Sequence, residues 1–150
     1  MSLRRIGREC AVQFLYQYRP ESGQETASAL NEALALFWPL REITDGVREF
    51  GETLIRGALS HLPPVDEKIR AYAENWDFER IASVDLAIIR LAVYEMLFRD
   101  DIPPVVSINE AIEIAKRFSS EESGRFVNGI LDRVRKDLMR PARQAAGGSL

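Results

Sequence analysis

The chain has 150 residues, of which 46% are hydrophobic and 29% charged, and its net charge at pH 7 is −3. This balance is typical of a globular protein with its own core, which excludes a fibrous or low-complexity chain. With one cysteine and no long apolar run, we expect no internal disulfide, no multi-cysteine zinc site and no membrane span.

Apolar residues recur at intervals of three and four along the first half of the chain, which predicts helices rather than strands. His61 precedes a Pro-Pro pair and is expected to cap the C-terminus of the third helix. The helices expected here cover about residues 3–18, 25–37, 44–60 and 65–74.

The segment 81–98 is apolar almost all round, which predicts a helix in the middle of a bundle. Asp85 interrupts it near its start, where a carboxylate favours the helix dipole or contacts a partner. Ser107 with Glu110, and Ser119 with Glu122, have capping-box spacing and predict helices over about 107–118 and 121–138.

These elements predict an all-α protein of about seven helices in two packed three-helix subdomains. We expect one domain over residues 1–140, with subdomains of about 1–62 and 63–138. Residues 141–150 are expected to form a disordered tail.

Charge is unevenly distributed along the chain: residues 1–19 carry a net +3, residues 20–115 a net −10 and residues 116–150 a net +4. On a helical wheel Arg4, Arg5 and Arg8 fall on the solvent side of the first helix. These arginines could bind RNA phosphates, or they could simply be the solvated face of the helix. The RNA interpretation requires that cations from both ends gather in one accessible patch.

The last helix contains a second candidate site, in the segment SSEESGRFVNGILDRV. Phe126 lies at the margin of the apolar arc, and Gly129 leaves room beside it for a flat ligand. Asn128 offers both a donor and an acceptor to a base edge. The alternative is that Phe126 packs into a neighbouring helix.

Catalytic patterns are weak in this sequence. His61 has no evident nucleophile beside it, and the carboxylates of Glu110 and Glu113 have a spacing that is common on helix surfaces. The sequence contains no Gly-rich phosphate loop and no HExxH motif. We therefore expect no enzyme, no cofactor and no metal site.

Four segments, RECAVQFLYQ, LAIIRLAVYEM, VVSINEAIEIAKRF and GRFVNGILD, resemble the bacterial NusB family of transcription antitermination factors. The resemblance implies an all-helical fold and a cytoplasmic protein without catalysis. It also implies binding of single-stranded boxA RNA from ribosomal RNA leaders together with NusE, a small-subunit ribosomal protein. This assembly would join other Nus factors on RNA polymerase.

The resemblance also implies roles for individual residues. Because Gly7 interrupts the arginine run, RNA affinity without NusE is expected to be modest. A protein-binding module remains an alternative, as a monomer or a homodimer, whereas the chain is too short for a fused RNA methyltransferase. Tyr16 and Asp85 would face NusE. The RNA contacts would be Arg4, Arg5, Arg8, Gln13, Glu121, Glu122, Arg125, Phe126 and Asn128.

Overall fold

The computed structural model describes residues 2–18, 26–73 and 78–138. These ranges contain helices and no strand, which confirms the all-α prediction. Two short 3₁₀ turns, η1 (Trp38–Leu40) and η2 (Phe78–Arg80), lie between the helices. The helices are α1 (Leu3–Tyr18), α2 (Ala27–Phe37), α3 (Asp45–Ser60), α4 (Leu62–Tyr72), α5 (Ser83–Phe98), α6 (Pro104–Phe118) and α7 (Glu121–Lys136).

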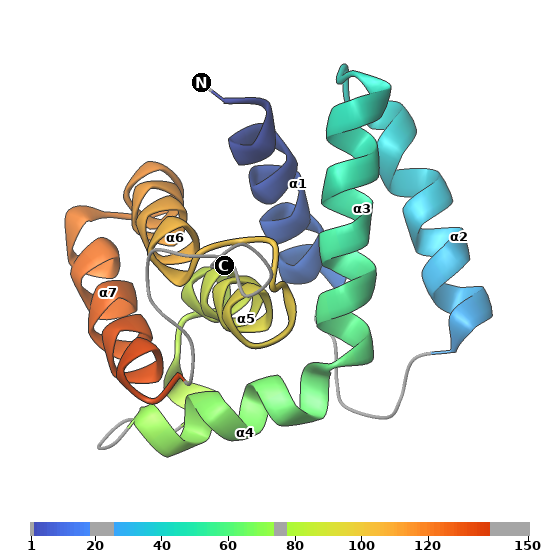
Figure 1. Cartoon of the computed structure of the whole chain (residues 1–150). Coiled ribbons are helices and arrows are strands. Elements are labelled where there is room, and N and C mark those ends of the chain that lie inside the picture. Colours follow the sequence, from blue (N-terminus) through green and yellow to red (C-terminus); the bar gives the residue numbers. More distant parts are fainter. Residues whose placement is uncertain (1, 19–25, 74–77, 139–150) are drawn as a thin grey trace.

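Helix α5 lies in the middle of the bundle, as its all-round apolar sequence predicts. Every residue from Ala87 to Met96 is buried, and α5 packs against α1, α3, α4, α6 and α7. Figure 1 shows α6 and α7 on one side of α5, α1 and α3 on the other, and α2 at the outer edge beside α3. The molecule therefore has a well-covered centre and one peripheral helix.

The predicted start of α4 is wrong by three residues. The helix begins at Leu62, and Pro63 and Pro64 lie in its first turn. Proline is tolerated there because the first amides of a helix have no intrahelical acceptor. His61 caps α3 as expected, with its Nδ1 2.9 Å from the carbonyl oxygen of Gly57.

The capping box predicted at Ser107 is also wrong, because α6 begins earlier, at Pro104. The Ser107 hydroxyl instead donates to the carboxylate of Glu95 on α5, 2.8 Å away. At α7 the cap is Ser120, not Ser119, and its hydroxyl accepts from the amide of Ser123 at 3.0 Å. A tertiary hydrogen bond thus overrides the capping signal at Ser107, and the capping signal at Ser119 is wrong by one residue.

The division into subdomains of about 1–62 and 63–138 stays a prediction, and the expected tail, 141–150, lies outside the described residues. Among the helices described, none has the length and apolar character needed to cross a membrane.

Candidate nucleic-acid and partner interface

The arginines of α1 do not form the solvent-side stripe that the helical wheel predicts. Arg8 is 3% exposed, and its Nε and one terminal nitrogen donate to the two carboxylate oxygens of Glu95, at 2.9 and 3.0 Å. Helix α1 packs against α3 and α5 at once, so it has two buried sides rather than one. The guanidinium of Arg8 is therefore inside the bundle, and the predicted exposure of Arg8 is wrong.

Glu95 completes a buried polar network between α1, α5 and α6. It is 1% exposed and accepts from Ser107 as well as from Arg8. A buried charge requires a partner and hydrogen bonds, since an unpaired one is strongly destabilising. The acidic residue in the apolar run LAVYEM was the sequence signal for this network, and our sequence analysis missed it.

Arg5 lies near the surface but is also paired. Its Nε donates to Oε1 of Glu110 on α6 at 3.0 Å, and a second bond joins its terminal nitrogen to Oε2. This hydrogen-bonded pair raises the pKa of Arg5. Arg4 is exposed, and its guanidinium lies 4.7 Å from the centre of the Phe50 ring on α3. Of the three predicted arginines, Arg4 and Arg5 remain accessible.

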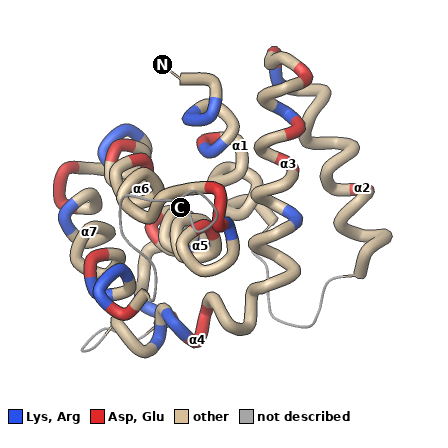
Figure 2. The backbone as a smooth tube through the Cα atoms, in the orientation of Figure 1, with Lys and Arg blue, Asp and Glu red and all other residues tan. Residues whose placement is uncertain are grey.

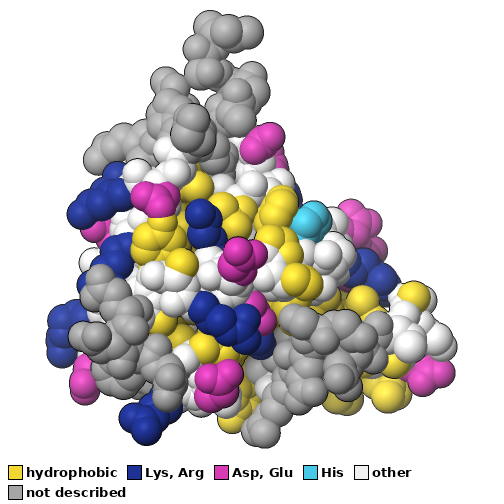
Figure 3. Space-filling view, turned by 90° about the horizontal axis from the view of Figure 1, so that it is seen from below, with side chains coloured by type: hydrophobic (Ala, Val, Ile, Leu, Met, Phe, Trp, Pro, Cys, Tyr) yellow, Lys and Arg dark blue, Asp and Glu magenta, His cyan; other side chains and the backbone are white. Residues whose placement is uncertain are grey.

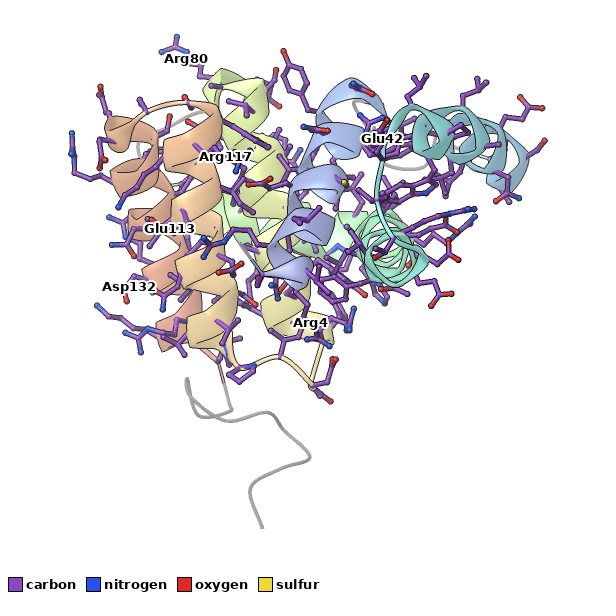
Figure 4. All side chains as sticks on the ribbon, turned by 90° about the horizontal axis from the view of Figure 1, so that it is seen from above. Arg4, Glu42, Arg80, Glu113, Arg117 and Asp132 are labelled. Atoms are coloured by element: carbon purple, nitrogen blue, oxygen red, sulfur yellow. The ribbon has the colours of Figure 1, made fainter. Side chains whose placement is uncertain are left out.

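A further ion pair joins α1 and α6 along the line where the two helices meet. Nη1 of Arg117 lies 3.6 Å from Oε2 of Glu9, which accepts no hydrogen bond. Burial raises the pKa of Glu9. Figure 4 shows Arg4 and Arg80 at opposite ends of the bundle with Arg117 between them. Arg4 and Arg117, one from each basic end of the chain, therefore lie apart along an extended strip and not in the compact patch that the sequence analysis requires.

One groove opens between α1, α5 and α6, and we call it the Tyr16 groove. It has a volume of about 530 Å³, and Tyr16 remains 42% exposed on its rim. Gln13, the predicted RNA contact, is exposed and accepts from Arg41 at 3.2 Å. The lining residues are Val12, Gln13, Tyr16, Ser83, Val84 and Phe118.

A smaller groove of about 250 Å³, the Phe126 groove, lies on the other side of the start of α5. Asp85 lines it and is 7% exposed; Oδ2 accepts from the Ser123 hydroxyl at 3.4 Å, and Oδ1 is buried without a hydrogen bond. Desolvation raises the pKa of Asp85, although the Ser123 bond lowers it. The lining residues are Arg80, Ile81, Ala82, Asp85, Ser120, Glu122, Ser123 and Phe126.

The two grooves bring together residues that the sequence analysis treated separately. Tyr16 and Asp85 come from α1 and α5, and both lie beside the first turn of α5. Phe126 is half-buried: it packs against the core, as the packing alternative requires, and it also lines its groove. Its stacking on a ligand stays a prediction. Arg80 and Phe118 were not predicted, because nothing in their local sequence marks them.

The other α7 residues lie outside the grooves. Glu121, Arg125 and Asn128 are exposed, and a side chain at Gly129 would meet open space. Seen from below, Lys and Arg side chains gather along the edge of the molecule on the α7 side (Figure 3). Helix α7 thus has an open, partly basic outer face.

The described residues contain no cluster of three or more His, Cys, Asp or Glu side chains that could hold a metal ion. The grooves contain exposed or half-buried aromatic rings, and the Phe126 groove also carries the charges of Arg80, Asp85 and Glu122. The fold and this surface define a helical binding module.

Comparison with known proteins identifies the class more closely. The model of the NusB family matches residues 5–136. A transcription antitermination protein NusB from Methylacidiphilum infernorum is 46% identical over 95% of this chain and 96% of its own length. A transcription antitermination protein NusB from Geobacter sulfurreducens is 45% identical over 92% of this chain and 97% of its own length. The chain belongs to the NusB family, which confirms the resemblance.

Solved structures agree with this assignment. Thermotoga maritima NusB has a TM-score of 0.75 at 35% identity, with 93% of this chain and 94% of that chain covered. The NusB of a structure of antitermination factors NusB and NusE in complex with dsRNA has a TM-score of 0.73 at 23% identity, with coverage of 92% and 99%. At that identity the second likeness concerns the fold alone.

Proposed function

We propose that this protein is a cytoplasmic, non-catalytic transcription antitermination factor that binds boxA RNA together with NusE on RNA polymerase. The observation that carries the proposal is the pair of adjoining grooves at the start of α5. One presents Tyr16 and the other presents Phe126, in a chain of the NusB family.

The RNA would lie along the strip between the start of α1 and the start of α7. Arg4, Arg5 and Arg125 would meet phosphates, and Phe126 would stack on an unpaired base. The carboxylates of Glu121 and Glu122 can accept hydrogen bonds from base amino groups, and the amides of Gln13 and Asn128 can read either a donor or an acceptor. In this proposal Arg8 stabilises the bundle and does not touch RNA.

NusE would cover the Tyr16 groove and reach Asp85. The buried Oδ1 of Asp85 lacks a donor, and a hydrogen-bond donor from a partner would satisfy it. The accessible arginine charge is partly neutralised, because Arg5 is paired with Glu110 and Arg117 with Glu9. This pairing supports a modest RNA affinity for the protein alone and a stronger one with NusE.

The experiment is a titration of fluorescent single-stranded boxA RNA, with and without NusE, at several salt concentrations. We expect NusE to tighten binding, and we expect a log–log salt slope near about −3 if about four phosphates are contacted. A scrambled RNA of equal length is the control. Equal affinity for both RNAs in the presence of NusE would contradict the proposal.

Partner binding is tested separately by calorimetry with purified NusE. Tyr16→Ala should weaken NusE binding, whereas the adjacent Gln17→Ala should not, because Gln17 does not line the Tyr16 groove. If both variants bind NusE as the wild type does, NusE does not use this groove.

A further inference from the structure

The carboxylate of Glu110 on α6 holds the edge of Arg5 that an RNA phosphate would use. Nε of Arg5 donates to Oε1 of Glu110 at 3.0 Å, and Nη2 of Arg5 donates to Oε2. Arginine binds a phosphate with the same two parallel hydrogen bonds that it makes with a carboxylate. Glu110 therefore lies where a phosphate bound to this edge would lie.

Arg5 is a poor phosphate ligand while this pair is intact. The other edge of its guanidinium also carries N–H groups, but a phosphate bound there would lie close to the Glu110 carboxylate. The two negative groups would repel each other, and water screens them little because the Glu110 side chain is only 14% exposed. RNA must therefore displace Glu110 to gain the full contact with Arg5.

The surroundings of the pair permit this exchange. The Arg5 side chain is 30% exposed, so its guanidinium can turn toward solvent. Oε1 of Glu110 also lies 3.7 Å from Nη1 of Arg8, whose Nε and Nη2 are bonded to Glu95. When Arg5 leaves, Glu110 keeps a cationic neighbour, so the exchange creates no unpaired buried charge.

Glu110 differs from the other carboxylates near Arg5. Figure 2 shows blue and red bands on both α1 and α6, so basic and acidic residues alternate in this region. The hydrogen bonds from Glu110 are the main cause that raises the pKa of Arg5, and the charges of Glu113 and Glu9 add to it. Glu113 instead forms an ion pair with Lys116 at 3.4 Å. Glu110 is therefore the carboxylate that holds Arg5.

We propose that Glu110 is an internal competitor of RNA phosphate that sets the RNA affinity of this protein, an inference that rests on the proposed function. Without RNA, Glu110 holds Arg5. When RNA binds, a phosphate takes the Nε–Nη2 edge of Arg5, and Glu110 keeps its contact with Arg8. Because phosphate contacts carry no sequence information, the competition lowers the affinity for every RNA and leaves recognition to the base contacts.

The test is a titration of fluorescent boxA RNA with the full chain carrying Glu110→Gln or Glu113→Gln, with and without NusE. Each variant removes one carboxylate from α6, but only Glu110→Gln weakens the hold on Arg5. We expect Glu110→Gln to bind RNA about threefold to fivefold more tightly, the size of a partly exposed ion pair. Glu113→Gln should change the affinity by less than about twofold. A scrambled RNA should show the same gain as boxA RNA.

A double variant shows whether the gain depends on Arg5. Arg5→Ala combined with Glu110→Gln should bind RNA no more tightly than Arg5→Ala alone. Circular dichroism confirms that each variant is folded. An unchanged or weaker affinity in Glu110→Gln, an equal gain in Glu113→Gln, or a gain that survives without Arg5 would each overturn the inference.

A measurement on the wild type does not depend on the folding of any variant. In proton–nitrogen correlation spectra of the full chain, the Nε signal of Arg5 should move when boxA RNA and NusE are added, because its acceptor changes from carboxylate to phosphate. The Nε signal of Arg8 should stay in place, since Arg8 remains bonded to Glu95. An Arg5 signal that does not move while RNA is bound would also overturn the inference.

The same titrations separate this inference from the proposed function. If the wild type binds boxA RNA with NusE and Glu110→Gln binds it no more tightly, only the competitor role of Glu110 is wrong. If the wild type binds no boxA RNA even with NusE, the proposed function is wrong and the competitor role fails with it.

Discussion

Two arginines at the start of α1, Arg5 and Arg8, and one arginine of α7, Arg125, have opposite surroundings. Arg5 and Arg8 are held by carboxylates from α6 and α5, and the Arg8 pair is fully buried. Arg125 on α7 is exposed, and no described carboxylate lies within ion-pair distance of it. Arg5 and Arg8 hold neighbouring helices together, whereas Arg125 remains available to a ligand.

The largest effect is expected from breaking the buried pair. Glu95→Ala removes both hydrogen bonds of the buried Arg8 guanidinium and leaves only Oε1 of Glu110, 3.7 Å from its Nη1, beside the charge. This should lower the free energy of unfolding by about 3 kcal/mol. Urea denaturation followed by circular dichroism measures this. Glu113→Ala, on the exposed side of α6, is the control and should change it by no more than about 0.5 kcal/mol. If Glu95→Ala lowers the free energy of unfolding only slightly, the Arg8 guanidinium must reach solvent in the variant.

The next largest effect is expected at Phe126 on α7, the proposed stacking contact with RNA. Phe126→Leu keeps an apolar group at the core margin but removes the aromatic face. It should weaken boxA RNA binding by about 1–3 kcal/mol, the contribution of one stacked base. The change in folding stability should stay below about 1.5 kcal/mol. Phe118→Leu, in the Tyr16 groove, is the control for RNA binding without NusE; an equal loss there would contradict stacking on Phe126.

A smaller effect on RNA binding should distinguish Arg125, which is exposed, from Arg135, which is in an ion pair. Arg125→Ala should weaken RNA binding and make the log–log salt slope shallower by about 0.7, because one phosphate contact is lost. Arg135→Ala should leave the slope unchanged, since Arg135 is paired with Asp132 at 2.8 Å. Titrations at four or more salt concentrations give both slopes. Identical slopes for the two variants and the wild type would mean that α7 does not meet phosphate.

The same contrast explains how far the sequence could predict this molecule. Apolar spacing predicted every helix from α1 to α7, and Asp85 lies in the first turn of α5, as its place in the sequence predicted. The helical wheel failed at Arg8 because a wheel assumes one buried side, and α1 has two. It could not pair Arg8 with Glu95, since 87 residues separate them in the chain.

Two predicted residues of α7, Phe126 and Asn128, show the opposite situation. Phe126 and Asn128 were chosen for a local property, their place on one helix, and that property needs no tertiary information. The grooves themselves could not be predicted, because their walls come from distant segments, such as Val12 with Phe118 and Arg80 with Ser123. Periodicity therefore predicts single helices well and predicts the space between helices poorly.

The smallest effect concerns Glu9. Burial raises the pKa of this carboxyl above its ordinary value of 4.5. The folded protein thus binds this proton more readily than the unfolded chain does, and stability falls as pH rises through the window above 4.5. Glu9→Gln removes the buried charge, so the variant should be the more stable protein at pH 7, and the difference should disappear below about pH 4.5.

The gain in Glu9→Gln should be less than about 1 kcal/mol, because the variant also loses the attraction of the largely exposed Arg117. Thermal melts from about pH 4 to about pH 8 measure it. Glu49→Gln, an exposed carboxylate on α3, is the control and should follow the wild type at every pH. A Glu9→Gln variant less stable than the wild type at pH 7 would mean that the pair with Arg117 outweighs desolvation. The α1–α6 seam would then be held by its charges in the same way as the Arg8 network.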